Sequence, residues 1–206
     1  MNKTKHLTIS TLTEGDYVST CRVFEKSISD AFNKEGLGHL QEDIQSETDH
    51  KKQKALSSLK QANTDIYFFI ANINGKVVGT ISYGPCGETI QICAEHQLDH
   101  LGELGSLYVL PSYQGQGIGS ALIKQMMIFL HEHGIEQFCL DSGYKRAQIK
   151  WQRKFGEPYK VIKDYWGPDS DHMVWLCNVS DHLEKETCKK CLTYKPSMSK
   201  FASSKL

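Results

Sequence analysis

The chain has 206 residues, and its 24 basic and 24 acidic side chains give a formal net charge of zero at pH 7. This balance argues against general binding to nucleic acid or to anionic membranes. No apolar run approaches the roughly 18 residues of a membrane-spanning helix, and residues 1–6 lack the apolar stretch of a signal peptide. We therefore expect a cytoplasmic protein with one domain over residues 1–180 and a lysine-rich tail over 181–206.

Apolar spacing and turn signals predict a strand, two helices and a hairpin in the first part of the chain. These elements are a strand over 7–12, an amphipathic helix over 15–32, a highly charged helix over 40–61, and strands over 66–73 and 76–83. The dipeptide Asn74-Gly75 between the last two strands is the strongest short signal for an antiparallel hairpin.

A polar interruption over residues 84–102 is expected to be a solvated loop. It contains Cys93, His96 and His100, which together could be imagined as metal ligands. No second, tightly spaced pair of ligands accompanies them, as a structural metal site would require. We therefore predict no metal site.

A glycine-rich turn follows the next strand. Residues 107–110 form a short apolar run that suits a buried strand. Gly115, Gly117 and Gly119 then alternate, and helical spacing begins at Ile118. The buried face of this helix is predicted to consist of Ile118, Ala121, Leu122, Met126, Phe129 and Leu130. Free backbone N–H groups at a helix N-terminus beside glycines form a site for phosphate oxygens.

Two nucleotide-binding alternatives fit this turn less well. A dinucleotide fold requires G-x-G-x-x-G with an acidic residue about 20 positions later. Gly115, Gly117 and Asp141 fit that pattern, but Ser120 stands where the third glycine belongs. The upstream hairpin also disagrees with the alternating strands and helices of such a fold. A P-loop is excluded, because no Gly-Lys-Ser/Thr follows at the required spacing.

The last part of the domain is predicted to contain three strands and one helix. They are a strand over 135–140, a helix over 144–155 that ends at Gly156, and strands over 159–166 and 172–178 on either side of Gly167-Pro168-Asp169.

The stretch Gln114-Gly115-Gln116-Gly117-Ile118-Gly119 matches the signature Q/R-x-x-G-x-G/A, and residues 103–120 resemble the GNAT family of N-acetyltransferases without a gap. The resemblance implies an α/β fold of the α+β type in a single domain. Its central sheet would be mixed, mostly antiparallel, with about six to seven strands flanked by helices. The sheet would splay into a V at the strand that binds acetyl-CoA.

The resemblance further implies acetyl-CoA as co-substrate and an amine acceptor as the second partner. The pyrophosphate would lie on the backbone amides of residues 115–120, and the pantetheine arm would pair with residues 107–109. The residues assigned in this way to cofactor binding are Leu107, Tyr108, Val109, Gln114, Gly115, Gln116, Gly117, Ile118, Gly119 and Ser120. The backbone N–H of Val109 would polarise the thioester carbonyl. A homodimer is one assembly that the sequence leaves open.

Glu103 is the candidate catalytic residue. An alkyl ammonium with a pKa near 10.4 is protonated at neutral pH, so acetyl transfer needs a base for the acceptor. Glu103 lies four residues before Leu107, near the start of the strand beside the thioester. Many relatives carry a glutamate there that acts as base. The other interpretation is a surface carboxylate at the end of a strand.

The late helix departs from the family pattern F-Y-x-K-L-G-F, whose tyrosine protonates the leaving thiolate. The matching stretch here is Trp151-Gln152-Arg153-Lys154-Phe155-Gly156, with Gln152 in the tyrosine position. Tyr144 lies about two turns earlier, too far to replace it, and is expected to contact the CoA arm or to pack. The resulting interpretation is an N-acetyltransferase acting on a primary amine of unknown identity. The alternative is a catalytically weak acyl-CoA-binding module of the same fold.

Overall fold

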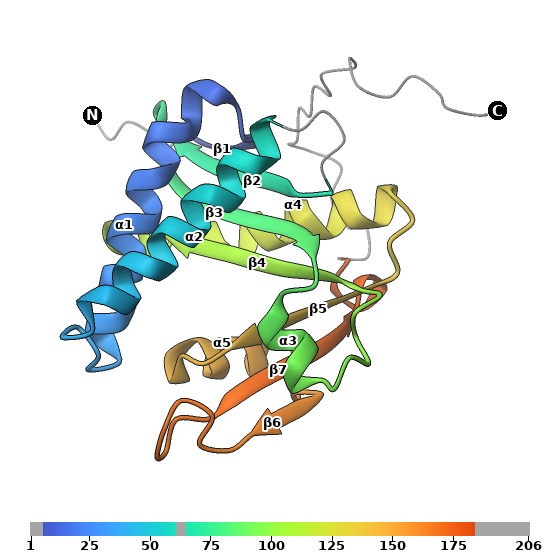
Figure 1. Cartoon of the computed structure of the whole chain (residues 1–206). Coiled ribbons are helices and arrows are strands. Elements are labelled where there is room, and N and C mark those ends of the chain that lie inside the picture. The colour runs from blue at the N-terminus through green and yellow to red at the C-terminus, as the bar shows by residue number, and fades with distance from the viewer. Residues whose placement is uncertain (1–5, 61–64, 184–206) are drawn as a thin grey trace.

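The computed structural model describes residues 6–60 and 65–183, which form one mixed sheet of seven strands (Figure 1). The strand order is β1-β2-β3-β4-β5-β7-β6, and only the neighbours β4 and β5 run parallel. The strands are β1 Leu7–Thr11, β2 Tyr67–Ile73, β3 Lys76–Pro85, β4 Gly102–Val109, β5 Gln137–Ser142, β6 Lys160–Ile162 and β7 His172–Asn178. The predicted mixed, mostly antiparallel sheet is therefore confirmed.

Helices cover both faces of this sheet. They are α1 Tyr17–Lys34, α2 Gln41–Lys60, α3 Glu88–Cys93, α4 Ile118–Glu132 and α5 Lys145–Phe155, with single 3₁₀ turns at Glu14–Asp16, Pro111–Tyr113 and Val179–His182. The neighbouring helices α1 and α2 cross one face, and α4 lies against the opposite face (Figure 1). The predicted order of strands and helices is thus present, including the hairpin of β2 and β3 at Asn74-Gly75.

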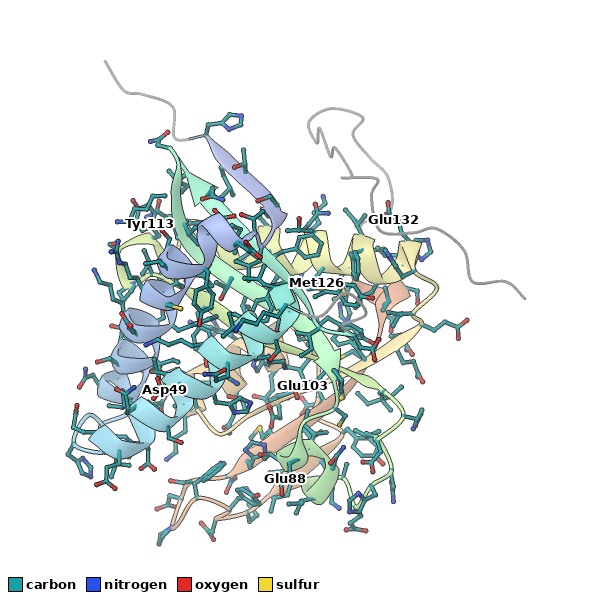
Figure 2. All side chains as sticks on the ribbon, turned by 45° about the horizontal axis from the view of Figure 1, so that its top comes forward. Asp49, Glu88, Glu103, Tyr113, Met126 and Glu132 are labelled. Atoms are coloured by element: carbon teal, nitrogen blue, oxygen red, sulfur yellow. The ribbon has the colours of Figure 1, made fainter. Side chains whose placement is uncertain are left out.

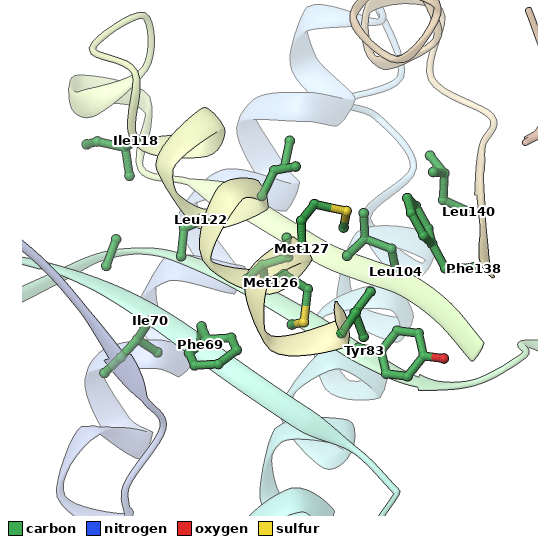
Figure 3. Packing of buried hydrophobic residues seen from close by; sticks show 14 of the residues in the cluster. Phe69, Ile70, Tyr83, Leu104, Ile118, Leu122, Met126, Met127, Phe138 and Leu140 are labelled. Carbon is green, nitrogen blue, oxygen red and sulfur yellow. The ribbon is translucent and has the colours of Figure 1, made fainter. Parts of the chain in front are cut away.

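The main core lies between the sheet and α4. Leu122 and Met126 are fully buried there, in one cluster with Phe69 and Phe138 of the strands (Figure 3). Four of the six predicted face residues of α4 are buried, and so are Ile123 and Met127, because the helix packs over a wider stripe than the prediction allowed. A second cluster joins α1 and α2 to the sheet and consists of Phe24, Ile28, Phe32, Ala55 and Phe68.

The parallel strands β4 and β5 separate soon after they meet. Their register contains only the pairs Gly102↔Phe138 and Glu103↔Cys139. Beyond Glu103 the two strands diverge, so each presents backbone that the other does not pair. This is the V-shaped splay that the resemblance implies, and it opens at the residue proposed as the base.

The prediction of a solvated loop over residues 84–102 is wrong for its first half, which forms the short helix α3. Ile90 and Cys93 stand three residues apart and are 0% and 4% exposed. They pack against Cys139 and Val174 in a small cluster under α3. Two apolar anchors among polar residues give too short a pattern to reveal a helix.

The predicted strand over 159–166 is also too long, because β6 ends at Ile162. Asp164 follows with a positive φ of 52°. The Asp171 carboxylate accepts a hydrogen bond from the N–H of Asp164 at 3.1 Å. It also forms an ion pair with Lys163 at 2.6 Å. Side-chain acceptors for the backbone compete in this way with a strand ladder and favour a turn.

The tail predicted over 181–206 falls outside the described residues from position 184 onward. Within residues 6–60 and 65–183, no helix combines the length and apolar character needed to cross a membrane.

Candidate active site

The turn between β4 and α4 has two positions whose backbone conformation favours glycine. Gly115 and Gly117 have φ values of 74° and 79°, in the left-handed region that other residues rarely adopt. Gly117 is also the N-cap of α4. A Cβ placed on either glycine would meet nothing within 4 Å. The turn is therefore fixed by backbone conformation, and it leaves open space on the side where side chains would project.

The first turn of α4 supplies hydrogen-bond donors beside that space. The first bond inside the helix runs from the N–H of Ala121 to the carbonyl of Gly117 at 3.0 Å. The helix itself consequently makes no use of the N–H groups of Ile118, Gly119 and Ser120. Amides at the positive end of a helix dipole fit phosphate oxygens, so these predicted residues suit the pyrophosphate of CoA.

The side chains of Gln114 and Gln116 hold the turn in place. Gln114 donates through Nε2 to the carbonyl of Val109 at 3.1 Å and accepts from Lys34 Nζ at 2.9 Å. Gln116 donates to the carbonyl of Ser112 at 3.1 Å. These bonds tie the glycine turn to the end of β4 and to α1, so both glutamines support the turn with their side chains.

A β-bulge interrupts β4 just before the predicted pantetheine-binding residues 107–109. Thr80 pairs with Tyr108 and Ser82 with Gly105, so β4 has an extra residue in between. Ser106 takes a φ of 49°, and the buried Thr80 hydroxyl donates to its carbonyl at 2.8 Å. A bulge bends its strand and takes backbone groups out of the regular ladder. The bulge lies just beyond Glu103, the last residue of β4 that pairs with β5.

The carboxylate of Glu103 is held inside the structure rather than at its surface. Its side chain is 13% exposed, and Oε2 accepts the N–H of Gly87 at 2.9 Å. Lys54 of α2 lies on the other side, with Nζ 3.9 Å from Oε1. Figure 2 shows Glu103 on its strand between α2 and the short helix α3. The interpretation of Glu103 as an exposed strand-end carboxylate therefore does not fit.

Two glycines leave room for this carboxylate. A Cβ on Gly87 would lie 2.6 Å from Glu103 Oε2, and a Cβ on Gly105 would lie 2.6 Å from Oε1. Neither glycine has a positive φ, so the backbone conformation alone would accept alanine at both positions. Space for Glu103 is the physical reason for glycine at these two positions.

A second carboxylate, Glu47 of α2, joins the helix to the splayed strands. It accepts the hydroxyl of Tyr108 at 2.6 Å and that of Tyr144 at 2.5 Å. Burial, followed by the charge of Glu47, raises the pKa of both phenols, so both stay protonated. Tyr144 also packs edge-on against Phe32. Of the two roles expected for Tyr144, the structure shows packing.

Lys54 and His50 of α2 lie near the carboxylate of Glu103. Burial lowers the pKa of Lys54 below that of an ordinary lysine, while the nearby Glu103 carboxylate opposes that change. Burial, reinforced by the charges of Lys51 and Lys54, lowers the pKa of His50. Lys54 and Glu103 thus face each other as two charged side chains that are each only 13% exposed.

Asp141 at the end of β5 borders this region and is oriented by a buried histidine. Trp166 donates its indole N–H to His172 Nδ1 at 3.0 Å, so the imidazole proton is on Nε2. That Nε2 lies 3.0 Å from Asp141 Oδ2 and donates to it. The neighbouring Cys139 thiol donates to Cys86 Sγ at 3.8 Å.

Two further features lie outside the site. A surface hollow of about 530 Å³ lies between α1 and the turn after β4. Its lining includes Asn33, Lys76 and Pro111 and none of the predicted site residues. In the described part of the chain, no group of three or more His, Cys, Asp or Glu side chains is placed to hold a metal ion. His96 is instead paired with Asp99 at 2.8 Å, and Cys93 is in the α3 cluster.

Sequence reasoning missed most of what surrounds Glu103. Glu47 and Lys54 lie on a helix that the sequence marks only as highly charged, and Gly87 lies in the segment predicted to be a solvated loop. No local pattern marks these residues, since each acquires its role from a neighbour on another element. Gly105 lies two residues after Glu103 on the same strand, and it is the feature of the sequence that comes closest to indicating the surroundings of Glu103.

A mixed sheet that splays beside a glycine turn and the start of a helix is the arrangement of the GNAT fold. The chain belongs to the acetyltransferase (GNAT) family, whose model matches residues 33–156, more than half of its length. Members of this family are acetyl-CoA-dependent N-acetyltransferases.

Individual relatives agree with the class. Over 59 residues the chain is 37% identical to the thialysine N-epsilon-acetyltransferase of Sus scrofa, a match covering 29% of this chain and 31% of that protein. The chain thus spans less than a third of the length of this curated relative. Among solved structures, PaiA N-acetyltransferase from Thermoplasma acidophilum in complex with coenzyme A superposes with a TM-score of 0.60 at 19% identity, covering 84% of this chain and 99% of that one.

The ribosomal-protein-S18-alanine N-acetyltransferase of Escherichia coli is similar as well. It superposes with a TM-score of 0.57 at 15% identity, covering 91% of this chain and 99% of its own. At these identities the superpositions establish a shared fold.

Proposed function

We propose that this protein transfers the acetyl group of acetyl-CoA to a primary amine, with Glu103 as the general base. One observation carries the proposal: a carboxylate that is 13% exposed, held by the Gly87 N–H, lies at the point where β4 and β5 separate. Glycines at positions 87 and 105 leave the space that this carboxylate occupies. A protein that only bound acyl-CoA would have no use for such a group.

Acetyl-CoA fits the splay on three grounds. The amides at the start of α4 and the open side of Gly115 and Gly117 suit the pyrophosphate. Residues 107–109 follow the bulge and border the splay, which suits pairing with the pantetheine amides. The thioester would then lie along β4 near Glu103, and by the family resemblance the N–H of Val109 polarises its carbonyl.

The reaction begins with the acceptor as an ammonium ion. Glu103 takes one proton, directly or through a water, and the amine attacks the thioester carbon. The tetrahedral intermediate loses a second nitrogen proton to solvent, the carbon–sulfur bond breaks, and the thiolate of CoA leaves, with the acetylated amine as the other product. The pKa of the CoA thiol should be near the 8.5 of a free cysteine thiol, so departure needs only a hydrogen bond or solvent. Gln152 stands where relatives have a tyrosine, and a carboxamide has no proton to give near neutral pH.

A primary amine is the proposed acceptor class because two of the relatives carry amine acceptors in their names, thialysine in one and an alanine of a ribosomal protein in the other. Thiol release from acetyl-CoA over a panel of amines tests the proposal. The panel should include thialysine, lysine, small diamines and peptides with N-terminal alanine. Calorimetry with acetyl-CoA is run in parallel. Binding without turnover of any amine would favour the acyl-CoA-binding module over the enzyme.

A further inference from the structure

One lysine of α2 lies in front of the proposed base. Lys54 Nζ is 3.9 Å from Glu103 Oε1, and both side chains are 13% exposed. Lys52, two residues earlier, points elsewhere and pairs with Glu25 of α1 at 2.8 Å. The helix therefore sends one lysine across its own face to α1 and another into the acceptor side of the splay.

The amine of Lys54 lies beside the carboxylate that an external acceptor would have to reach. A general base acts within about 3 Å of the amine or through one water. At 3.9 Å the two groups are an ion pair without a hydrogen bond, so a small rotation of the flexible lysine stem would close the distance. An acceptor amine that approaches Glu103 has to displace Lys54 or share the space with it.

The burial of Lys54 favours a reactive amine. The carboxylates of Glu103 and Asp141 stabilise its ammonium form, whereas burial and the charge of Lys51 disfavour it. Burial is the largest of these effects, and it lowers the pKa of Lys54. A larger fraction of Lys54 is therefore unprotonated at neutral pH than of a lysine in water. Neutral amine is the form that attacks a thioester.

We propose that Lys54 is itself an acetyl acceptor, so that the protein acetylates its own α2 helix at the active site. The inference rests on the proposed function, because it uses acetyl-CoA in the splay and Glu103 as base. Glu103 takes a proton from Nζ, the nitrogen forms a bond to the thioester carbon, and the carbon–sulfur bond breaks. The products are Nε-acetyl-Lys54 and CoA, whose thiolate receives the proton.

The modification converts the ion pair of Lys54 with Glu103 into an amide beside a carboxylate. The amide carries no charge and adds an acetyl group to a space that is already nearly closed to water. External amines should then reach Glu103 less easily. Self-acetylation is accordingly expected to slow transfer to the amine panel by about tenfold, the size of a modest loss of access to a catalytic group.

To test this, the full chain is incubated with acetyl-CoA in the absence of any amine. The products are then analysed by intact-mass and peptide mass spectrometry. We expect one acetyl group per chain, on Lys54, with a rate constant that does not change with protein concentration because the reaction is intramolecular. Lys54→Arg should lose the label and Lys52→Arg should keep it. Glu103→Gln should slow labelling at least tenfold, as expected for loss of a general base.

Three outcomes would overturn the inference. Absence of acetyl-Lys54 in a preparation that turns over an external amine would remove it and leave the proposed function standing. Equal labelling of Lys51, Lys52 and Lys54 would show indiscriminate chemical acetylation. Failure to bind acetyl-CoA at all would remove both the inference and the proposed function.

Discussion

The two sides of the splay are built in opposite ways. On the cofactor side, the turn before α4 uses backbone amides and open space, and Cβ atoms on Gly115 and Gly117 would meet nothing within 4 Å. On the acceptor side, side chains are packed against one another, and Cβ atoms on Gly87 and Gly105 would both lie 2.6 Å from the carboxylate of Glu103.

Glycine therefore has two different functions in one site. Gly115 and Gly117 are needed for their left-handed backbone, and we propose that they also leave room for the cofactor. Gly87 and Gly105 are needed because a neighbouring side chain occupies their space. The first kind of substitution should affect cofactor binding, and the second kind should affect the chemical step. The predictions below test that division.

The largest effect is expected for Gly117→Glu, which should abolish acetyl-CoA binding. The carboxylate would face the pyrophosphate, and like charges placed together cost several kcal/mol, or at least about a hundredfold in affinity. Any residue other than glycine is strained at a φ of 79°, so Gly117→Ala is the control for strain without charge. Calorimetry on folded protein provides the measurement. Equal affinities for wild type and Gly117→Glu would rule out the phosphate site.

The next largest effect is expected for Glu103→Gln, which should lower kcat/KM by roughly 10²- to 10⁴-fold at neutral pH. The deficit should shrink as pH rises, because more of the acceptor is then already the free amine. Acetyl-CoA affinity should stay unchanged, since the residue belongs to the acceptor side. The pH profile of both proteins gives the answer, and a variant as active as wild type at every pH would exclude Glu103 as base.

The cofactor side could be predicted from the sequence because it is contiguous. Gly115 and Gly117 determine their own backbone conformation, and Ile118 begins a helix with a clear periodicity. On the acceptor side the sequence pointed only to Glu103, through a family resemblance, and its role as base stays a proposal. Its surroundings depend on which strands are neighbours and where α2 crosses them, so the roles of Lys54 and Gly87 exist only in the folded chain.

A smaller effect is expected for Gly105→Ala, which should move the Glu103 carboxylate and leave the fold intact. The group that the new Cβ meets is the far end of a flexible side chain, so the carboxylate can shift. Misplacement of a catalytic group by about 1 Å can cost up to a hundredfold, and we expect a ten- to hundredfold loss in kcat/KM.

A double-mutant cycle isolates the cause of that loss. In a Glu103→Ala background, Gly105→Ala should have no further effect on kcat/KM, because no carboxylate remains to be displaced. Additive losses would mean that Gly105 acts on the reaction by another route, such as the shape of β4.

The smallest effect is expected for Gln152→Ala on α5, which should cost about tenfold or less in kcat/KM. A general acid would contribute roughly 10²- to 10⁴-fold, and a carboxamide cannot act as one near neutral pH. Steady-state rates with the best amine of the panel, alongside CoA affinity, give the measurement. A thousandfold loss with CoA affinity intact would assign Gln152 an essential part in the reaction.

The same reasoning extends to the tyrosines that could replace the missing acid. Burial is the largest cause that raises the pKa of Tyr108, Tyr144 and Tyr165, so the folded protein keeps these phenols protonated above the usual value of 10. Their ionisation should therefore give the pH–rate curve no falling limb near pH 9–10. Because the neutral forms are favoured only in the fold, stability should fall as pH rises beyond about 10, where unfolded tyrosines ionise. A falling limb at pH 9–10 that disappears in Tyr108→Phe, Tyr144→Phe or Tyr165→Phe would identify that residue as the proton donor.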